Sequence, residues 1–105
     1  MDNETWIIEE GDVVITKQKK VGESGLDELE RLIYWFWWAD YMIRGAGDFE
    51  NAVALEKDFQ EQICIEAQNL GFEYTLQTFR LCRQELIDQY YDRFDRVCNE
   101  IRSID

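Results

Sequence analysis

Apolar residues recur with helical spacing through most of the chain after residue 24. An α-helix turns by about 100° per residue, so side chains three or four positions apart share a face. Between Thr75 and Arg102 the apolar side chains fall on one such face, opposite a row of acids. The apolar set is Leu76, Phe79, Leu86, Ile87, Tyr90, Phe94, Val97, Cys98 and Ile101, and the acidic set is Glu85, Asp88, Asp92 and Asp95. The spacing predicts one long helix from Thr75 to about Arg102.

Two further helices are predicted upstream. Ser24 is a favourable N-cap for a helix over about 25–44, which the Gly-Ala-Gly sequence at 45–47 ends. Asp48 can cap a second helix that runs to about 69 and stops before a glycine. The apolar stripe of this helix is Phe49, Ala52, Val53, Phe59, Ile63, Ala67 and Leu70. The chain contains no proline that would interrupt these helices.

The first 23 residues have a different pattern. Segments 5–8 (Thr-Trp-Ile-Ile) and 13–16 (Val-Val-Ile-Thr) are rich in β-branched and aromatic residues, and the Glu-Glu-Gly-Asp sequence at 9–12 has turn chemistry. This pattern predicts a short β-hairpin. A mobile basic arm around Lys17, Lys19 and Lys20 is expected to follow it.

The predicted fold is therefore mainly α. The length of 105 residues suits one domain. We expect a hairpin and mobile arm over 1–23 and a three-helix bundle-like core over 24–105.

The predicted helix over 25–44 carries large apolar groups around its whole circumference, in the sequence Leu-Ile-Tyr-Trp-Phe-Trp-Trp-Ala at 32–39. A helix that is apolar all round must be covered on every side. Two interpretations are open. Either the chain itself wraps this helix, or Trp35, Trp38 and Met42 on one side of it form an interface, since exposed aromatic patches mark binding surfaces.

Three charged residues occupy positions where the wheels place apolar neighbours: Asp40, Glu56 and Arg83, one in each predicted helix. Arg44 lies one turn after Asp40 on the same face. Buried charges are almost always paired, so we expect one internal network in which Arg83 bridges Asp40 and Glu56. We interpret the network as a structural ion-pair cluster rather than a catalytic or metal pocket, because the arginines neutralise the acids that a cation would need.

The charge balance limits the classes of partner that the protein can bind. Eleven Lys and Arg residues against 23 Asp and Glu residues give a formal net charge of −12. A field of this sign repels phosphate and anionic membranes, so we expect a basic protein partner and neither nucleic acid nor membrane. Histidine is absent, which excludes His-based catalytic triads and imidazole metal sites. We expect no catalytic residue, no metal and no cofactor.

The cysteines and the apolar runs indicate the compartment. Cys64, Cys82 and Cys98 are odd in number and widely spaced, which is typical of reduced thiols. The longest apolar run, 32–39, is far shorter than the roughly 20 residues of a membrane span. The acidic N-terminus does not resemble a signal peptide. We therefore expect a soluble, cytoplasmic protein.

The stretch from about 29 to 101 resembles an acidic, helical family of bacterial proteins that includes a DNA mimic. The resemblance is carried by the hydrophobic helix with Asp40 near its end, by the Gly-Ala-Gly-Asp-Phe turn at 45–49, and by the Leu-Gly-Phe turn at 70–72. Arg44 stands where the family has asparagine, and Ala46 separates the two glycines. The resemblance implies a non-enzymatic protein that presents carboxylates, like a phosphate backbone, to a DNA-binding partner.

The resulting hypothesis is a non-enzymatic acidic module that masks a basic surface of a partner protein. The partner would be a nuclease, a toxin or a DNA-binding protein, and the module an immunity or antitoxin-type inhibitor or a DNA mimic. We expect Glu50, Asp58 and Glu61, which share the outer face of the helix over 48–69, to contact it, with Trp35 and Trp38 as aromatic anchors. Two alternatives remain: a helical subunit of a homodimer, and an enzyme that uses carboxylates.

Overall fold

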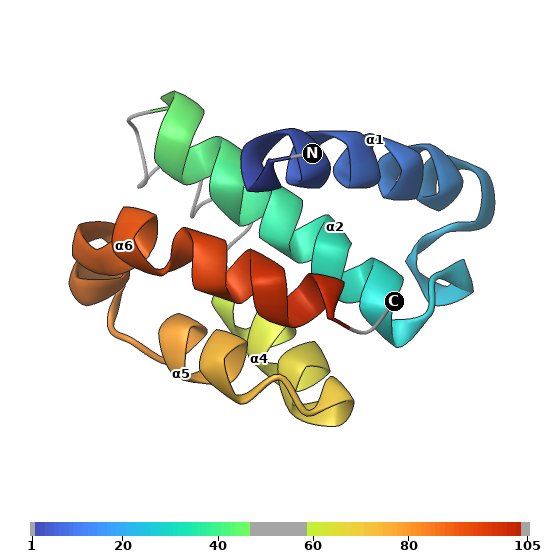
Figure 1. Ribbon diagram of the computed structural model, residues 1–105. Helices are drawn as coiled ribbons and strands as arrows, with labels where there is room; N and C mark the ends of the chain where they lie inside the picture. The colour runs from blue at the N-terminus through green and yellow to red at the C-terminus, as the bar shows by residue number, and fades with distance from the viewer. Residues whose placement is uncertain (1, 47–58, 104–105) are drawn as a thin grey trace.

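Helices account for nearly all of the described chain (Figure 1). The computed structural model describes residues 2–46 and 59–103. The elements are α1 (Asn3–Val21), the 3-10 helix η1 (Glu23–Gly25), α2 (Glu28–Tyr41), the π-helical segment η2 (Met42–Ala46), α4 (Phe59–Leu70), α5 (Glu73–Phe79) and α6 (Arg83–Arg102). Neither described range contains a strand. The mainly α class is therefore confirmed, and the predicted β-hairpin is wrong.

Helix α1 replaces both the hairpin and the basic arm. The Asp2 carboxylate caps it by accepting a hydrogen bond from the backbone N–H of Thr5, at 2.7 Å. Gly22, with φ of 76°, ends it in a backbone conformation that favours glycine. Lys19 and Lys20 in the last turn complement the helix dipole. Caps and packing thus outweigh the weak strand preference of the β-branched residues.

Gly11, which the sequence pattern places in a turn, lies in the middle of α1. A Cβ atom added to Gly11 would lie 2.0 Å from Cδ1 of Trp37, on α2. Gly11 is buried together with Ile7 and Val14, which share its face of the helix. The absence of a side chain therefore lets α1 approach the Trp37 ring closely.

Helix α2 is central, with α1 along one side of it and α4 along another (Figure 1). A capping box starts the helix: Asp27 Oδ1 accepts from the Glu30 N–H at 2.8 Å, and Glu30 Oε1 accepts from the Asp27 N–H at 3.0 Å. Ser24, the predicted cap, lies in η1 instead. The helical path continues past Tyr41 into η2, close to the predicted end at Arg44.

The predicted helix over 48–69 is described only in its last part. Helix α4 begins at Phe59, and residues 47–58 lie outside the described residues. Within α4, Phe59, Ile63 and Ala67 are buried, as the apolar stripe predicts.

The predicted long C-terminal helix is two helices, α5 and α6, separated at residues 80–82. Side chains from elsewhere satisfy backbone groups near this break. The Gln60 amide of α4 donates to the carbonyls of Phe79 and Leu81, at 3.3 and 3.1 Å. At the other end of α5, the Glu100 carboxylate of α6 accepts from the N–H groups of Tyr74 and Thr75, at 3.0 and 2.7 Å. The break lets α5 pack against both α4 and α6.

The core lies where these helices converge on α2. Phe36 of α2 meets Phe79 of α5 edge-on, with ring centroids 5.9 Å apart. It also contacts Phe94 of α6, at 6.0 Å. All three rings are buried, so this cluster fixes where the end of α2 sits relative to α6.

Candidate partner-binding surface

Asp40 lies near the end of α2 and is buried, with 7% of its surface exposed. Its Oδ1 atom accepts hydrogen bonds from Nε of Arg44, at 2.8 Å, and from the hydroxyl of Tyr90 on α6, at 2.5 Å. Burial raises the pKa of Tyr90 well above its usual value, and the adjacent Asp40 carboxylate adds to the rise. The phenol therefore stays protonated and remains a donor to the carboxylate.

Arg44 lies on η2, one turn after Asp40. Its Nη1 donates to Oε1 of Glu4, at 2.7 Å. Its guanidinium carbon lies 4.4 Å from the ring centroid of Phe94 and 4.9 Å from that of Tyr91. The structure thus brings the predicted Asp40 and Arg44 together, and joins α1 and α6 to them.

Arg83, the predicted bridge, lies at the start of α6. Its Nε donates to Oε1 of Gln60, at 2.9 Å, and its guanidinium lies over the Phe59 ring, at 5.3 Å. Within the described chain, Asp40 accepts hydrogen bonds from Arg44 and Tyr90. Glu56 lies outside the described residues, so its place in the network stays a prediction.

The predicted contact residues are described only in part. Glu61 is exposed on α4, whereas Glu50 and Asp58 lie outside the described residues. Trp35 and Trp38 are half-buried on α2, and the indole Nε1 atom of each is buried without a hydrogen-bond partner among the described residues. Their role at an interface stays a prediction.

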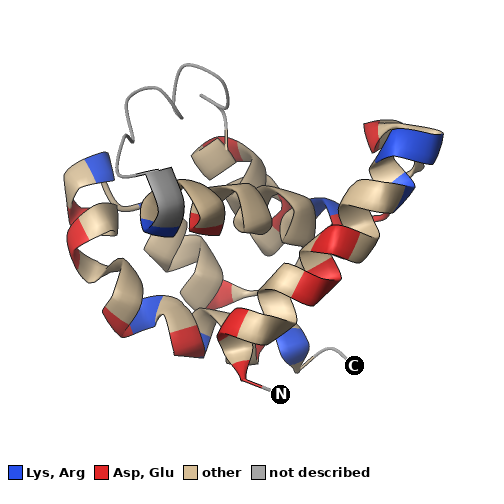
Figure 2. Cartoon of the chain, turned by 90° about the horizontal axis from the view of Figure 1, so that it is seen from above, with Lys and Arg blue, Asp and Glu red and all other residues tan. Residues whose placement is uncertain are grey.

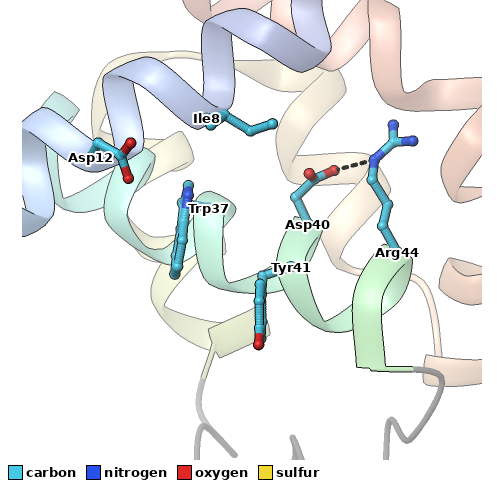
Figure 3. A pocket seen from close by; sticks show the side chains of 6 residues that line it. All are labelled: Ile8, Asp12, Trp37, Asp40, Tyr41 and Arg44. Atoms are coloured by element: carbon cyan, nitrogen blue, oxygen red, sulfur yellow. Dashed lines mark hydrogen bonds and ion pairs between the residues drawn. The ribbon is translucent and has the colours of Figure 1, made fainter.

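A pocket of about 300 Å³ opens between α1 and the end of α2 (Figure 3). Its lining residues are Ile8, Asp12, Trp37, Asp40, Tyr41 and Arg44. The rings of Trp37 and Tyr41 stack, with centroids 5.6 Å apart and an interplanar angle of 11°. Ile8 and Tyr41 are more than half exposed, at 53% and 55%. The pocket combines accessible apolar surface with two carboxylates.

Several arginines of the described chain lie against aromatic rings. Besides Arg44 and Arg83, the guanidinium of Arg96 lies 4.1 Å from the ring centroid of Tyr74, and that of Arg102 lies 5.4 Å from Trp6. These contacts hold several positive charges close to the protein surface.

The acids of α1 have a different environment. Glu9, Glu10 and Asp12 are exposed and form no ion pair with the described residues. Acidic positions follow one another along α1 until the lysines at its C-terminal end (Figure 2). Of these lysines, Lys17 pairs with Glu30, at 2.9 Å. The outward-facing charge of α1 is therefore negative over its N-terminal half.

Glu66 is a second buried acid, which sequence reasoning missed. It is 5% exposed, and its Oε1 accepts from Nε of Arg31, at 3.3 Å. Its Oε2 is buried with no partner among the described residues. Its position three residues after Ile63, on the apolar stripe of the helix, was the available signal.

The pocket residues Ile8, Asp12, Trp37 and Tyr41 were also missed. Ile8 and Asp12 belong to a segment that the pattern predicts as a hairpin, and a hairpin does not place them on one helical face. Trp37 and Tyr41 are four residues apart, which on a helix places their rings side by side. That spacing was a signal for an aromatic pair at the end of α2.

The described residues were also compared with the requirements of a metal site and of a membrane-spanning helix, and the chain with known proteins. No group of three or more His, Cys, Asp or Glu side chains in ranges 2–46 and 59–103 has the arrangement of a metal site. None of the described helices has the length and apolarity needed to cross a membrane. No family model, curated protein or solved structure matches the chain.

Proposed function

We propose that this protein is a non-enzymatic acidic module that binds a partner protein and masks a basic surface on it. The observation that supports the proposal is that positive and negative side chains have different environments at the surface. Several arginines, among them Arg44 and Arg96, lie over aromatic rings, whereas the acids at positions 9, 10 and 12 are exposed without ion pairs among the described residues.

This arrangement suits rapid and selective association. Unpaired surface carboxylates create a negative potential that steers a basic partner and accelerates encounter. The same potential disfavours nucleic acid and anionic membranes. The net charge of −12 and the absence of histidine agree with a binding role rather than acid–base catalysis.

The proposal has specific forms. The partner is a nuclease, a toxin or a DNA-binding protein, and the module acts as an immunity or antitoxin-type inhibitor or as a DNA mimic. We also place the protein in the cytoplasm, because its three cysteines are free thiols, which suit a reducing compartment.

Affinity capture of the tagged protein from its source cell, with mass spectrometry, tests the proposal. We expect a basic protein that forms a defined complex, whose association rate falls as salt rises because the Debye length shortens from about 10 Å at 0.1 M to about 3 Å at 1 M. Recovery of only nucleic acid, only an acidic protein, or no partner at all would contradict it.

Light scattering on the pure protein tests the structural alternative. A monomer agrees with a module that acts on another protein. A stable homodimer that buries the exposed rings and apolar side chains of α1 and α2 would favour the homo-oligomeric subunit instead.

A further inference from the structure

We propose that the pocket between α1 and α2 receives an arginine side chain from the basic partner. This inference rests on the proposed function and assigns it a specific contact. Figure 3 shows how the pocket residues lie: Ile8 and Asp12 come from α1, and Trp37 and Tyr41 project from α2.

The first requirement of such a site is an accessible aromatic surface. Trp37 and Tyr41 stack on each other, and Tyr41 is 55% exposed. Trp37 is held against α1, because it lies where a side chain at Gly11 would have to be. The aromatic wall is therefore ordered before any partner arrives, which lowers the entropic cost of binding.

The second requirement is negative charge that the protein has not neutralised. The side chain of Asp12 is exposed, with no ion pair to described residues. The charge of Asp40 is paired with Arg44, but the hydrogen bonds from Arg44 and Tyr90 both go to Oδ1, so among the described residues Oδ2 keeps its capacity to accept a hydrogen bond.

Among the described residues that line this pocket, Arg44 is the one with a positive charge, and it is already paired. Its Nε donates to Asp40 and its Nη1 donates to Glu4. Its guanidinium also lies over the Phe94 ring. The described lining residues thus carry two carboxylates, Asp12 and Asp40, against the one guanidinium of Arg44, so their summed charge is negative.

The third requirement is a shape that selects arginine. A planar guanidinium stacks on aromatic rings and bonds a carboxylate through two parallel donors, whereas a lysine ammonium is a compact and strongly hydrated charge. The protein already uses this geometry internally, where Arg96 lies over Tyr74 at 4.1 Å. The half-exposed Ile8 offers apolar contact for the aliphatic stem. A volume of about 300 Å³ is at the small end for ligand pockets, which suits a single side chain.

Titration of the full-length protein with an octa-arginine peptide and an octa-lysine peptide, at low salt, tests this assignment. We expect the arginine peptide to bind more tightly. Asp12→Asn and Tyr41→Ala should each weaken it by about three- to tenfold, the range expected for one ion pair or one cation–π contact. Both side chains are exposed, so the fold should persist, which circular dichroism verifies.

Matched controls separate this pocket from general charge attraction. Glu10→Gln removes the same charge as Asp12→Asn from α1, but on another face of the helix, and Val13→Ala removes an exposed apolar side chain there. Neither control should change the affinity by as much as twofold. Equal binding of both peptides, with Glu10→Gln as harmful as Asp12→Asn, would overturn the pocket and leave the proposed function standing. If neither peptide binds, the pocket assignment is also overturned. The proposed function is then tested separately by partner capture.

Discussion

The end of α2 has one flank toward α6 and one toward α1, and the charged residues on the two flanks have opposite environments. On the flank toward α6, the buried Asp40 accepts from Arg44 and Tyr90, and Arg44 lies over Phe94. On the flank toward α1, Asp12 and Tyr41 face solvent beside the pocket. The first arrangement satisfies a charge within the protein, and the second leaves charge and aromatic surface for another molecule.

This difference separates two roles that acidic residues of one small region can have. A buried carboxylate that loses its partners is costly, so the Asp40 cluster fixes the relative positions of α2 and α6. An exposed carboxylate contributes little to stability and is free to serve recognition. Substitutions on the two flanks should therefore affect different measurements.

Removal of the buried carboxylate should have the largest effect on stability. Asp40→Ala leaves Arg44 and the Tyr90 hydroxyl without their acceptor, and we expect the free energy of unfolding to fall by about 2–4 kcal/mol. The Arg44 side chain is 25% exposed and keeps Glu4, which limits the loss. Urea denaturation measures this change. Asp92→Ala, at an exposed position of α6, is the control and should leave the midpoint nearly unchanged.

The contact between α1 and Trp37 joins the two flanks, and a side chain at Gly11 should break it. Gly11→Ala improves helix propensity, yet the added methyl group overlaps Trp37, so we expect a net destabilisation of about 1–3 kcal/mol. A double-mutant cycle with Trp37→Leu measures the coupling. If the changes in the free energy of unfolding are additive, residues 11 and 37 are not coupled. The explanation that Gly11 makes room for the Trp37 ring would then be wrong.

Loss of the tyrosine hydroxyl should have a smaller effect with a characteristic pH dependence. Tyr90→Phe removes one buried hydrogen bond to Asp40, which we expect to cost about 1–2 kcal/mol at neutral pH. The pKa of Tyr90 is raised in the folded state, so its contribution is fully present below pH 10.0 and is lost as the pH rises from there toward the folded pKa. Stability of the parent protein should therefore fall above pH 10.0. In Tyr90→Phe the fall of stability with pH should be shallower. If the slope equals that of the parent protein, groups other than Tyr90 cause the loss of stability at alkaline pH.

The exposed acid should have the smallest effect on stability. Asp12→Asn removes no ion pair among the described residues, so we expect the free energy of unfolding to change by less than about 0.5 kcal/mol. A loss comparable to that of Asp40→Ala would show that Asp12 is a structural residue, and the contrast between the flanks would fail.

The sequence predicted the helical class, the apolar stripe of α4 and the shared face of Asp40 and Arg44, because these depend on spacing within one helix. The hairpin prediction was wrong because it rested on the β-branched segments and the turn sequence at 9–12, whereas Asp2 and Gly22 cap this stretch as one helix.

The break between α5 and α6 had no local signal. Its free carbonyls are satisfied by Gln60, about twenty residues earlier in the chain, and no helical wheel contains that information. The Asp12–Tyr41 pocket was missed for a related reason, since it depends on how closely α1 approaches α2 at Gly11.

The most direct test of the central claim is the association rate of the captured basic partner with two charge-reversed variants, at low and at high salt. Asp12→Lys places a positive charge in the pocket, and Glu73→Lys makes the same change at an exposed position on α5, away from α1 (Figure 1). We predict that Asp12→Lys slows association at low salt far more than Glu73→Lys does, and that the difference shrinks at high salt. Equal rates for the two variants at both salt concentrations would contradict the claim that the α1–α2 surface receives the partner.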